Sequence, residues 1–348
     1  MAGSRGYQSY SGRGASGGKI ALAVILVLVI AAAILVIAAQ RYIVYDETGT
    51  PQLTLPWQEN VLTEEEGDMT EEPPEEVEII PPEPEKPEEI RGFSIPVGVL
   101  TSEKWEAAKA SASADSTIAV TLKDSNSTVY FDTAMAVSGT VKTANDTMQV
   151  LSELTGETSD YHTIARISCF HDPKAAKSDV RGMGLRNTGG YIFYDGNNSQ
   201  WLDPAKPAAR QYLCNLAAEA AALGFDEILL TDVSYPAEGK LHKISYGETA
   251  KNQNMQVFLE EMRAALEVYD VKLSIELPTG VITEGRDDTV GLVLSEVVSQ
   301  VDRIYSVTTP DRVATLNAVI GVVDEEIQFI PEFTVEDPAF TENCLVLK

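Results

Sequence analysis

Residues 20–39 form an unbroken run of 20 apolar side chains, all of them Leu, Ile, Val or Ala. At a rise of about 1.5 Å per residue, a helix of this length spans the hydrocarbon core of a bilayer, which is about 30 Å thick. Helices buried in soluble proteins keep a polar face, and this run has none. The run therefore predicts a single transmembrane helix over residues 19–41, in contact with the lipid bilayer through residues 20–39.

The charges on the two sides of this run predict its orientation. The 348-residue chain has a net charge of −27, yet residues 1–45 contain four basic residues and no acidic one. Because basic residues favour the cytoplasmic side, we expect a cytoplasmic amino terminus and an extracytoplasmic location for everything after residue 45. A cleaved signal peptide is the alternative, although its apolar core is normally about 7–15 residues long.

Two segments lack the apolar residues that a folded core requires. Residues 1–18 are rich in Gly, Ser and Tyr, and we expect a disordered cytoplasmic tail. Residues 46–92 contain 16 acidic and two basic residues together with repeated Pro and Glu, so residues 42–92 are predicted to form a disordered, extended acidic linker. A strongly acidic chain repels phosphate backbones, which excludes nucleic acid as a partner.

The three cysteines and three histidines show no ligand spacing and no Cys-x-x-Cys pair. We therefore expect no metal site, and no motif supports a nucleotide or other cofactor. An extracytoplasmic domain almost without disulfides favours a bacterial cell surface over a secreted animal protein.

Residues 93–348 alternate short apolar runs with amphipathic stretches. Strands are expected at residues 95–100, 118–122, 164–170, 227–231, 272–277, 303–307, 327–330 and 344–347. The clearest helix covers residues 205–223, with Asp203 as its N-cap, Pro204 in its first turn and Gly224 at its end. A second helix is expected over residues 255–269.

This pattern predicts an α/β fold. Strands such as residues 228–230 are apolar on both faces, as in parallel sheets that are covered by helices. Seven or eight strand–helix units within residues 93–348 fit a (β/α)8 TIM-type barrel. A doubly wound open sheet is the competing fold, but its usual Gly-rich turn after the first strand is missing from residues 97–101.

Four predicted strands finish with a carboxylate. In a barrel, functional residues lie at the carboxyl ends of the strands. Those ends carry Asp124, Asp172, Asp232 and Glu276. Glycoside hydrolysis uses two carboxyl groups, one as an acid and one as a base or nucleophile, so these side chains are candidates for that chemistry.

Residues 160–240 resemble a known family. An Ala-Arg-Ile strand (165–167) ends in Phe-x-Asp-Pro (170–173), and a Trp-x-x-Pro segment (201–204) leads into a helix. An Ala-x-x-Gly-Phe-Asp-Glu-Ile segment (221–228) runs on to Tyr-Pro (235–236). These elements are similar to a bacterial family of glycosidase-like barrels found on anchored surface proteins, with weaker similarity over residues 93–348. The resemblance implies a barrel fold and hydrolysis of O-glycosidic bonds.

The chain also departs from that family. Thr121 and Thr231 stand where the family typically has acids, and Ser234 stands where it has a basic residue. Asp232 can replace the missing acid only if the strand has ended or bulged there, because adjacent residues of a strand point to opposite faces. In chitinase-like barrels the corresponding catalytic stretch is acidic, whereas here it is apolar, so substrate-assisted chitinase chemistry is not expected.

Asp232 and Glu276 are the predicted catalytic pair. A second set is predicted to bind substrate, and each member also has a structural interpretation as a paired arginine, a turn residue or a packed aromatic ring. This set consists of Asp124, Arg166, Asp172, Tyr191, Trp201 and Tyr235.

Two functional hypotheses follow. The first is a membrane-anchored, extracytoplasmic glycoside hydrolase that acts on a polysaccharide through paired carboxylates at the barrel mouth. The alternative is a catalytically inactive barrel that binds glycans or envelope proteins, because fold alone does not determine function.

Overall fold

The computed structural model describes residues 43–45, 51–53, 89–113, 116–156, 159–338, 340 and 343–348. The predicted tail (1–18), the predicted anchor (19–41) and most of the predicted linker (42–92) lie outside these ranges. Among the helices that are described, none combines the length and the apolar character needed to cross a membrane. The chain divides into two units, residues 1–81 and 82–348. In the first unit, strands β1 (Ile43–Tyr45) and β2 (Pro51–Leu53) pair antiparallel.

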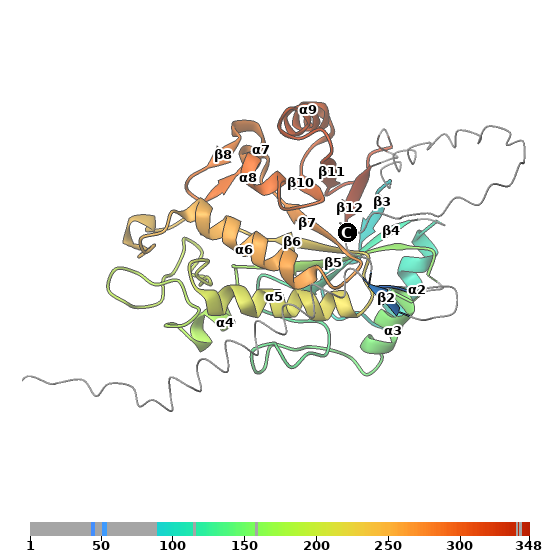
Figure 1. Cartoon of the computed structure of the whole chain (residues 1–348), viewed down its shortest axis with the longest axis horizontal. Coiled ribbons are helices and arrows are strands. Elements are labelled where there is room, and N and C mark those ends of the chain that lie inside the picture. Colours follow the sequence, from blue (N-terminus) through green and yellow to red (C-terminus); the bar gives the residue numbers. More distant parts are fainter. Residues whose placement is uncertain are drawn as a thin grey trace, which may run out of the picture. The chain divides into compact units, whose positions relative to one another are not determined.

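Eight parallel strands of the second unit close into a barrel, which confirms the predicted fold (Figure 1). In order around the barrel they are β3 (Arg91–Ser94), β4 (Thr117–Lys123), β5 (His162–Ser168), β6 (Glu227–Thr231), β7 (Lys272–Glu276), β10 (Arg303–Val307), β11 (Gln328–Phe333) and β12 (Cys344–Leu347). Because β12 pairs with β3, the first and last strands of the unit complete the ring.

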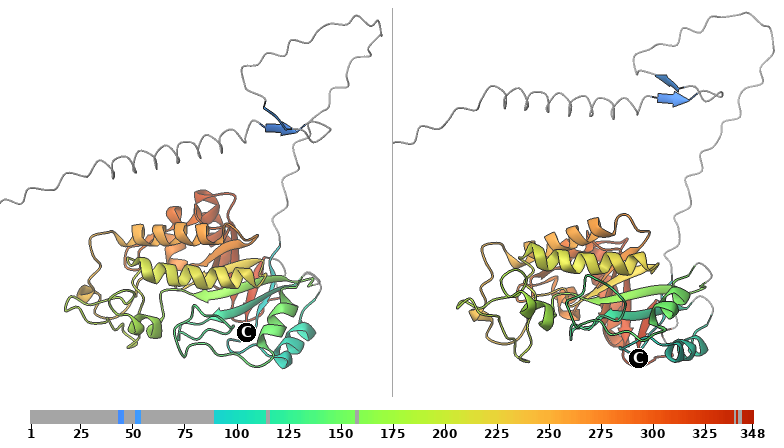
Figure 2. Two further views of the ribbon diagram at one scale, coloured as in Figure 1. Left: turned by 60° about the horizontal axis from the view of Figure 1, so that its bottom comes forward. Right: turned by 90° about the horizontal axis from the view of Figure 1, so that it is seen from below.

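Helices follow most of the strands and cover the outside of the barrel. They are α2 (Ser102–Ser111), α3 (Thr147–Leu154), α4 (Pro173–Ser178), α5 (Pro207–Ala222), α6 (Lys251–Leu266), α7 (Thr279–Glu284), α8 (Leu294–Val298) and α9 (Val313–Val323). Short elements between them are η1 (Leu241–Lys243), β8 (Arg286–Asp287), β9 (Leu292–Val293) and η2 (Pro310–Arg312). The two longest of these described helices, α5 and α6, lie side by side (Figures 1 and 2).

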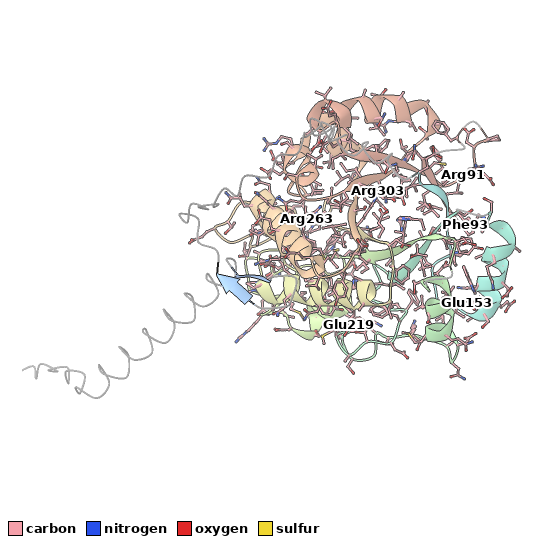
Figure 3. All side chains as sticks on the ribbon, turned by 45° about the vertical axis from the view of Figure 1, so that its right-hand side comes forward. Arg91, Phe93, Glu153, Glu219, Arg263 and Arg303 are labelled. Carbon is pink, nitrogen blue, oxygen red and sulfur yellow. The ribbon has the colours of Figure 1, made fainter. Side chains whose placement is uncertain are left out.

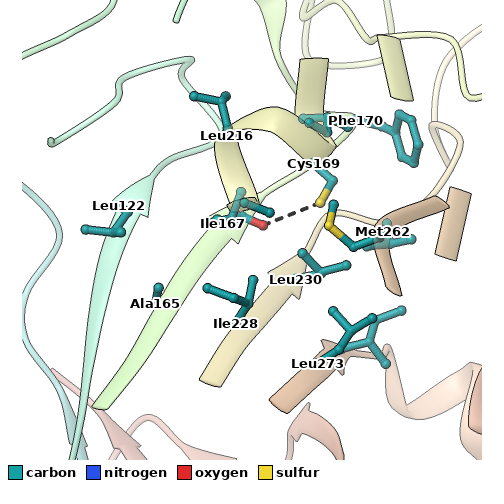
Figure 4. Close-up of a cluster of buried hydrophobic side chains, with 14 of the residues drawn as sticks. Leu122, Ala165, Ile167, Cys169, Phe170, Leu216, Ile228, Leu230, Met262 and Leu273 are labelled. Carbon is teal, nitrogen blue, oxygen red and sulfur yellow. Dashed lines mark hydrogen bonds between the residues drawn. The ribbon is translucent and has the colours of Figure 1, made fainter. Parts of the chain in front are cut away.

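Alternation along each strand divides its side chains between two cores. The outward residues, such as Ile167, Ile228 and Leu230, pack against helix residues that include Leu216 and Met262 (Figure 4). Burial of this apolar surface between sheet and helices is the main stabilising term of the fold. A smaller inward cluster fills the middle of the barrel and consists of Ile90, Ala119, Ile164, Leu229, Tyr305, Ile330 and Leu345. The middle of the barrel is thus a packed apolar layer and not a pore.

The first barrel strand differs from its predicted position. Strand β3 covers Arg91–Ser94, not residues 95–100, and Ile90 before it is fully buried. The apolar run after it contains Pro96 and Gly98, and Gly98 has φ +137°. Gly92 is required inside the strand because a Cβ there would meet the Thr117 carbonyl oxygen at 1.7 Å.

The start of the clearest helix also differs from its prediction. Helix α5 begins at Pro207 and its N-cap, Lys206, makes no side-chain capping bond. Asp203 accepts a hydrogen bond from the Ala205 amide instead, at 3.1 Å, and so stabilises the preceding turn. The prediction failed because two prolines lie close together, and the second one occupies the favoured first-turn position.

Candidate active site

A charged cluster lies inside the barrel on the carboxyl-terminal side of the central apolar layer. Arg166 comes from β5, Glu276 from the last position of β7, and Glu332 from β11. Each residue is two positions beyond an inward apolar residue or an inward serine of its own strand, so the period of two along a strand points all three into the barrel. The three side chains therefore meet although they are far apart in the sequence.

Arg166 joins the two carboxylates. Its Nη1 donates to Glu332 Oε1, and its Nη2 donates to Glu276 Oε2 at 2.5 Å. The Glu332 side chain has no exposed surface, whereas 27% of the Glu276 side chain is exposed. Glu276 is therefore the member of this cluster that a molecule outside the barrel can reach.

The buried carboxyl has an unusual proton affinity. Burial raises the pKa of Glu332 to about 8, since the charged form loses its hydration. Arg166 acts in the opposite direction, and the neighbouring Glu276 carboxylate raises the pKa further. Glu332 is consequently protonated near neutral pH.

Asp232 stands at the end of the strand next to Glu276. Strand β6 finishes at Thr231, and Asp232 has a left-handed backbone with φ +53°. Asp232 can point into the barrel only if the strand has ended or bulged before it, and strand β6 does end at Thr231. Its Oδ2 accepts a hydrogen bond from Ser168 Oγ at 2.6 Å, and its side chain is partly exposed. Since β6 pairs with β7, Asp232 and Glu276 lie at the carboxyl ends of neighbouring strands.

The Asp172 carboxylate is buried and makes its contacts inside the protein. It forms an ion pair of 3.0 Å with Lys123, and both side chains are buried. Its Oδ1 accepts from the Ala175 amide at 2.9 Å and so caps helix α4. Burial alone would raise the pKa of Asp172, but Lys123 and the hydrogen bonds of the carboxylate outweigh that effect and lower it. These contacts match the turn-forming interpretation of Asp172.

Asp124 organises the hairpin that follows β4. Its Oδ1 accepts from the amides of Asn126 and Thr128, and its Oδ2 accepts from the Tyr130 hydroxyl at 2.9 Å. Such local hydrogen bonds to the backbone are typical of Asx turns. The carboxylate is therefore largely used within its own loop.

The three predicted aromatic contacts have different environments. Tyr191 is 76% exposed on the loop between β5 and α5. Trp201 is nearly buried, stacks on His171 with ring centroids 4.5 Å apart, and donates through Nε1 to Asp195 at 2.8 Å. Tyr235 is fully buried, and its hydroxyl accepts a hydrogen bond from Asn254. Of the three, only Tyr191 offers a freely accessible ring.

Sequence reasoning missed Glu332. The predicted strand stopped at residue 330, which left the acid outside it, whereas β11 continues to Phe333. The available signal was the alternation of Gln328, Ile330 and Glu332, which places all three on one face of an extended strand. Pro331 hides this signal, because proline usually marks a strand as interrupted.

The amino-terminal end of the barrel contains a second charged cluster. A cleft of about 630 Å³ at this end is lined by residues that include His162, Asp302 and Arg303. Figure 3 shows Arg303 among the strands and Arg263, another lining residue, on helix α6. Within the described ranges, no group of three or more His, Cys, Asp or Glu side chains could hold a metal ion. Because the amino-terminal end of such barrels serves stability, the Glu276 end is the candidate active site.

Comparison with known proteins agrees with this architecture. Residues 108–325, more than half of the chain, match a family model described as "Putative glycosyl hydrolase domain". The chain is similar to the solved glycoside hydrolase domain of PgaB (BpsB) from Bordetella bronchiseptica, with 13% identity and a TM-score of 0.50 over 70% of this chain and 84% of that one. The comparison with curated proteins found no match.

Two further solved structures are similar to parts of this chain. One is alpha-L-fucosidase isoenzyme 2 from Paenibacillus thiaminolyticus, with 11% identity and a TM-score of 0.50 over 74% of this chain and 46% of that one. The other is a hypothetical protein from Ruminiclostridium thermocellum, with 24% identity and a TM-score of 0.43 over 50% of this chain and 91% of that one. At these identities the solved structures show a likeness of fold alone.

Proposed function

This chain belongs to the family of glycosyl hydrolase domains whose model spans residues 108–325, and from that premise we propose that its barrel hydrolyses O-glycosidic bonds of a polysaccharide. The observation that carries the proposal is the placement of Asp232 and Glu276 at the carboxyl ends of adjacent strands, with Glu276 held by Arg166.

The surroundings of the two carboxyls suit this chemistry. Both side chains are partly exposed, so both can reach a bound sugar. Arg166 fixes Glu276 through a short, charge-assisted hydrogen bond, and Ser168 fixes Asp232 in the same way. Fixed orientation of the reacting groups lowers the entropic part of the activation barrier. Tyr191 is the accessible ring that could stack on a sugar unit beyond the reacting bond.

The decisive experiment is turnover of a polysaccharide panel by the full chain and by Glu276→Gln and Asp232→Asn. We expect each variant to lose about 10²–10⁴-fold in kcat/KM, because a positioned acid or base contributes that much. Glu260→Gln is the matched control, since Glu260 is exposed on α6 and bonds only to the neighbouring Gln256 among its described contacts. Unchanged turnover in Glu276→Gln and Asp232→Asn would remove both residues from the mechanism.

A binding function without cleavage is the second candidate. The observation that favours it is the pair of threonines near the barrel mouth, Thr121 and Thr231, where the resemblance leads one to expect acids. A barrel of this kind would retain glycans from the same panel in a binding assay and release no reducing ends from any of them. Release of reducing ends that disappears in Asp232→Asn would reject this candidate.

We also propose that residues 20–39 anchor the barrel to a membrane, with the amino terminus in the cytoplasm and the barrel outside, at a bacterial cell surface. The support is the uninterrupted apolar run, the basic residues before it and the acidic segment after it. Cells that express the full chain should keep it in the membrane fraction after alkaline washing. A variant without residues 20–39 should become soluble, and solubility of the full chain would contradict the anchor.

A further inference from the structure

Two acids and one base meet in the cluster behind Glu276. The guanidinium of Arg166 uses different nitrogens for Glu276 and Glu332, so a single guanidinium holds both carboxyl groups. Glu332 is fully buried, and its second oxygen, Oε2, has no hydrogen-bond partner among the described residues. A buried oxygen without a partner is costly if it is ionised, and much less so if it carries a proton.

The charge balance of the cluster points in the same direction. If both carboxyls were ionised, the cluster would have a net charge of −1 in a space with little water. The charged or titratable groups that face Glu332 are Arg166 from β5, Glu276 from β7 and Tyr305 from β10. The nearest other buried base on this side, Lys123, is already paired with Asp172. One proton on the two carboxyls makes the cluster neutral, which is the cheaper state in a medium of low dielectric constant.

We propose that Glu276 and Glu332 share one proton, that Glu276 is the general acid of the reaction, and that Glu332 is the positioning residue that keeps this proton available. The inference rests on the proposed function and assigns the roles within its catalytic pair. Asp232 then takes the second role of the catalytic pair. Two carboxyls in different environments take the acid and base roles in this way in several glycosidases and proteases.

The resulting proton movements balance. Glu276 gives its proton to the glycosidic oxygen, and the electron pair of the bond from the anomeric carbon leaves with that oxygen. Both carboxyls are then ionised beside Arg166, because they held only one proton between them. Asp232 stabilises the positive charge that develops on the sugar. Water supplies its hydroxyl to the anomeric carbon and its proton to the carboxyl pair, so the site returns to its starting state.

Proton affinity and hydrogen bonding support these assignments. The pKa of Glu332 is raised to about 8, so the shared proton is present at neutral pH. Ser168 donates to Asp232 at 2.6 Å and so holds this carboxyl in place at the barrel mouth. Because Glu332 has no exposed surface, it can act on a substrate only through Glu276.

The kinetic test separates acid catalysis from mere structural support. Wild type, Glu332→Gln and the control Glu260→Gln are assayed on the polysaccharide that the panel identifies and on the 2,4-dinitrophenyl glycoside of the same sugar. Dinitrophenolate leaves without protonation, so Glu332→Gln should lose about 10²–10³-fold on the polysaccharide and less than about 10-fold on the aryl glycoside. An equal loss on both substrates would reduce Glu332 to a structural residue and overturn the proposal.

An infrared titration tests the shared proton without any turnover. Difference spectra of the wild-type chain are recorded as the pH rises from about 6 to about 10. In the wild type and in the control Glu260→Gln, we expect the band of a protonated carboxyl at low pH and its disappearance around pH 8. In Glu332→Gln this band should be missing. A wild-type spectrum without this band at about pH 6 would overturn the proposal even in an active enzyme. A band without turnover of any substrate would overturn the assigned acid role and the proposed function, while the shared proton itself would stand.

Discussion

Both ends of the barrel interior contain acidic and basic side chains, but the ratio of acids to bases differs between the two ends. At the amino-terminal end, Glu227 Oε2 meets two bases, Arg303 Nη1 at 2.5 Å and His162 Nε2 at 2.9 Å. At the carboxyl-terminal end, one base, Arg166, meets two acids. Both Glu227 and Glu332 are fully buried, and each has one oxygen without a hydrogen-bond partner among the described residues.

The proportion of acid to base determines the protonation of each buried glutamate. Burial alone would raise the pKa of Glu227, yet its hydrogen bond with His162 and the charge of Arg303 lower it. Burial raises the pKa of Glu332 to about 8, because a single arginine is divided between two carboxyls. An excess of base thus lowers the pKa of the buried Glu227, and an excess of acid leaves the pKa of the buried Glu332 raised.

The largest expected effect is the loss of the base at the amino-terminal end. Arg303→Met should lower the free energy of unfolding by about 3–5 kcal/mol, since it removes the charge paired with the buried Glu227. Arg166→Met should cost less, about 1–2 kcal/mol, because Glu332 is already neutral and Glu276 reaches solvent. Urea unfolding at neutral pH measures both values. Equal losses of unfolding free energy in the two variants would contradict the proposed difference between the two ends.

A smaller effect is a pH dependence of opposite sign at the two ends. Because the folded pKa of Glu332 lies above its unfolded value, its contribution to stability is complete below about pH 4.5 and is lost as the pH rises through about 8. The stability difference between wild type and Glu332→Gln should therefore fall steadily across this window. Denaturant unfolding at several pH values measures it.

Glu227 should show the reverse behaviour. Its pKa is lowered in the folded state, so its contribution is present above the unfolded value and is lost as the pH falls into the acid range. The stability difference between wild type and Glu227→Gln should accordingly increase with pH. If the two variants change with pH in the same direction, the comparison between the ends fails.

The smallest effect concerns the backbone at the mouth. Asp232 adopts φ +53°, a conformation that Asn tolerates and that Ala adopts at a cost of about 1–2 kcal/mol. Asp232→Asn should therefore stay within about 0.5 kcal/mol of wild type, whereas Asp232→Ala should be less stable by about 1–2 kcal/mol. Thermal unfolding separates the two variants, and equal stability would indicate that the turn has relaxed.

Much of the fold could be predicted because it depends on local patterns. The strands Glu227–Thr231, Arg303–Val307 and Cys344–Leu347 have the same bounds in sequence and structure, since short apolar runs between turns specify them. The first strand was misplaced because Gly92 and Ser94 lack the apolar side chains that mark a strand. The close approach of Gly92 to Thr117 places the strand at residues 91–94. That contact joins parts of the chain that are not adjacent in the sequence.

The candidate site could be predicted only in part. Asp232 and Glu276 could be predicted as candidates because strand ends are visible in the sequence. The role of Arg166 depends on its partners, which lie 110 and 166 residues away. Asp172 looks like a site residue in the sequence, but burial, a helix cap and Lys123 account for its carboxylate in the structure.

The sequence by itself determined the eight-stranded barrel of this protein and the acids at the ends of its strands, because hydrophobic periodicity and turn residues act over short distances. It also provides the prediction of an anchor and an acidic linker. Only the tertiary structure decided which acids share a base, since closing the barrel brings β5, β7 and β11 around one buried space. Burial and charge proportion in that space, which no local pattern specifies, raise the pKa of Glu332 and leave Glu276 facing the outside.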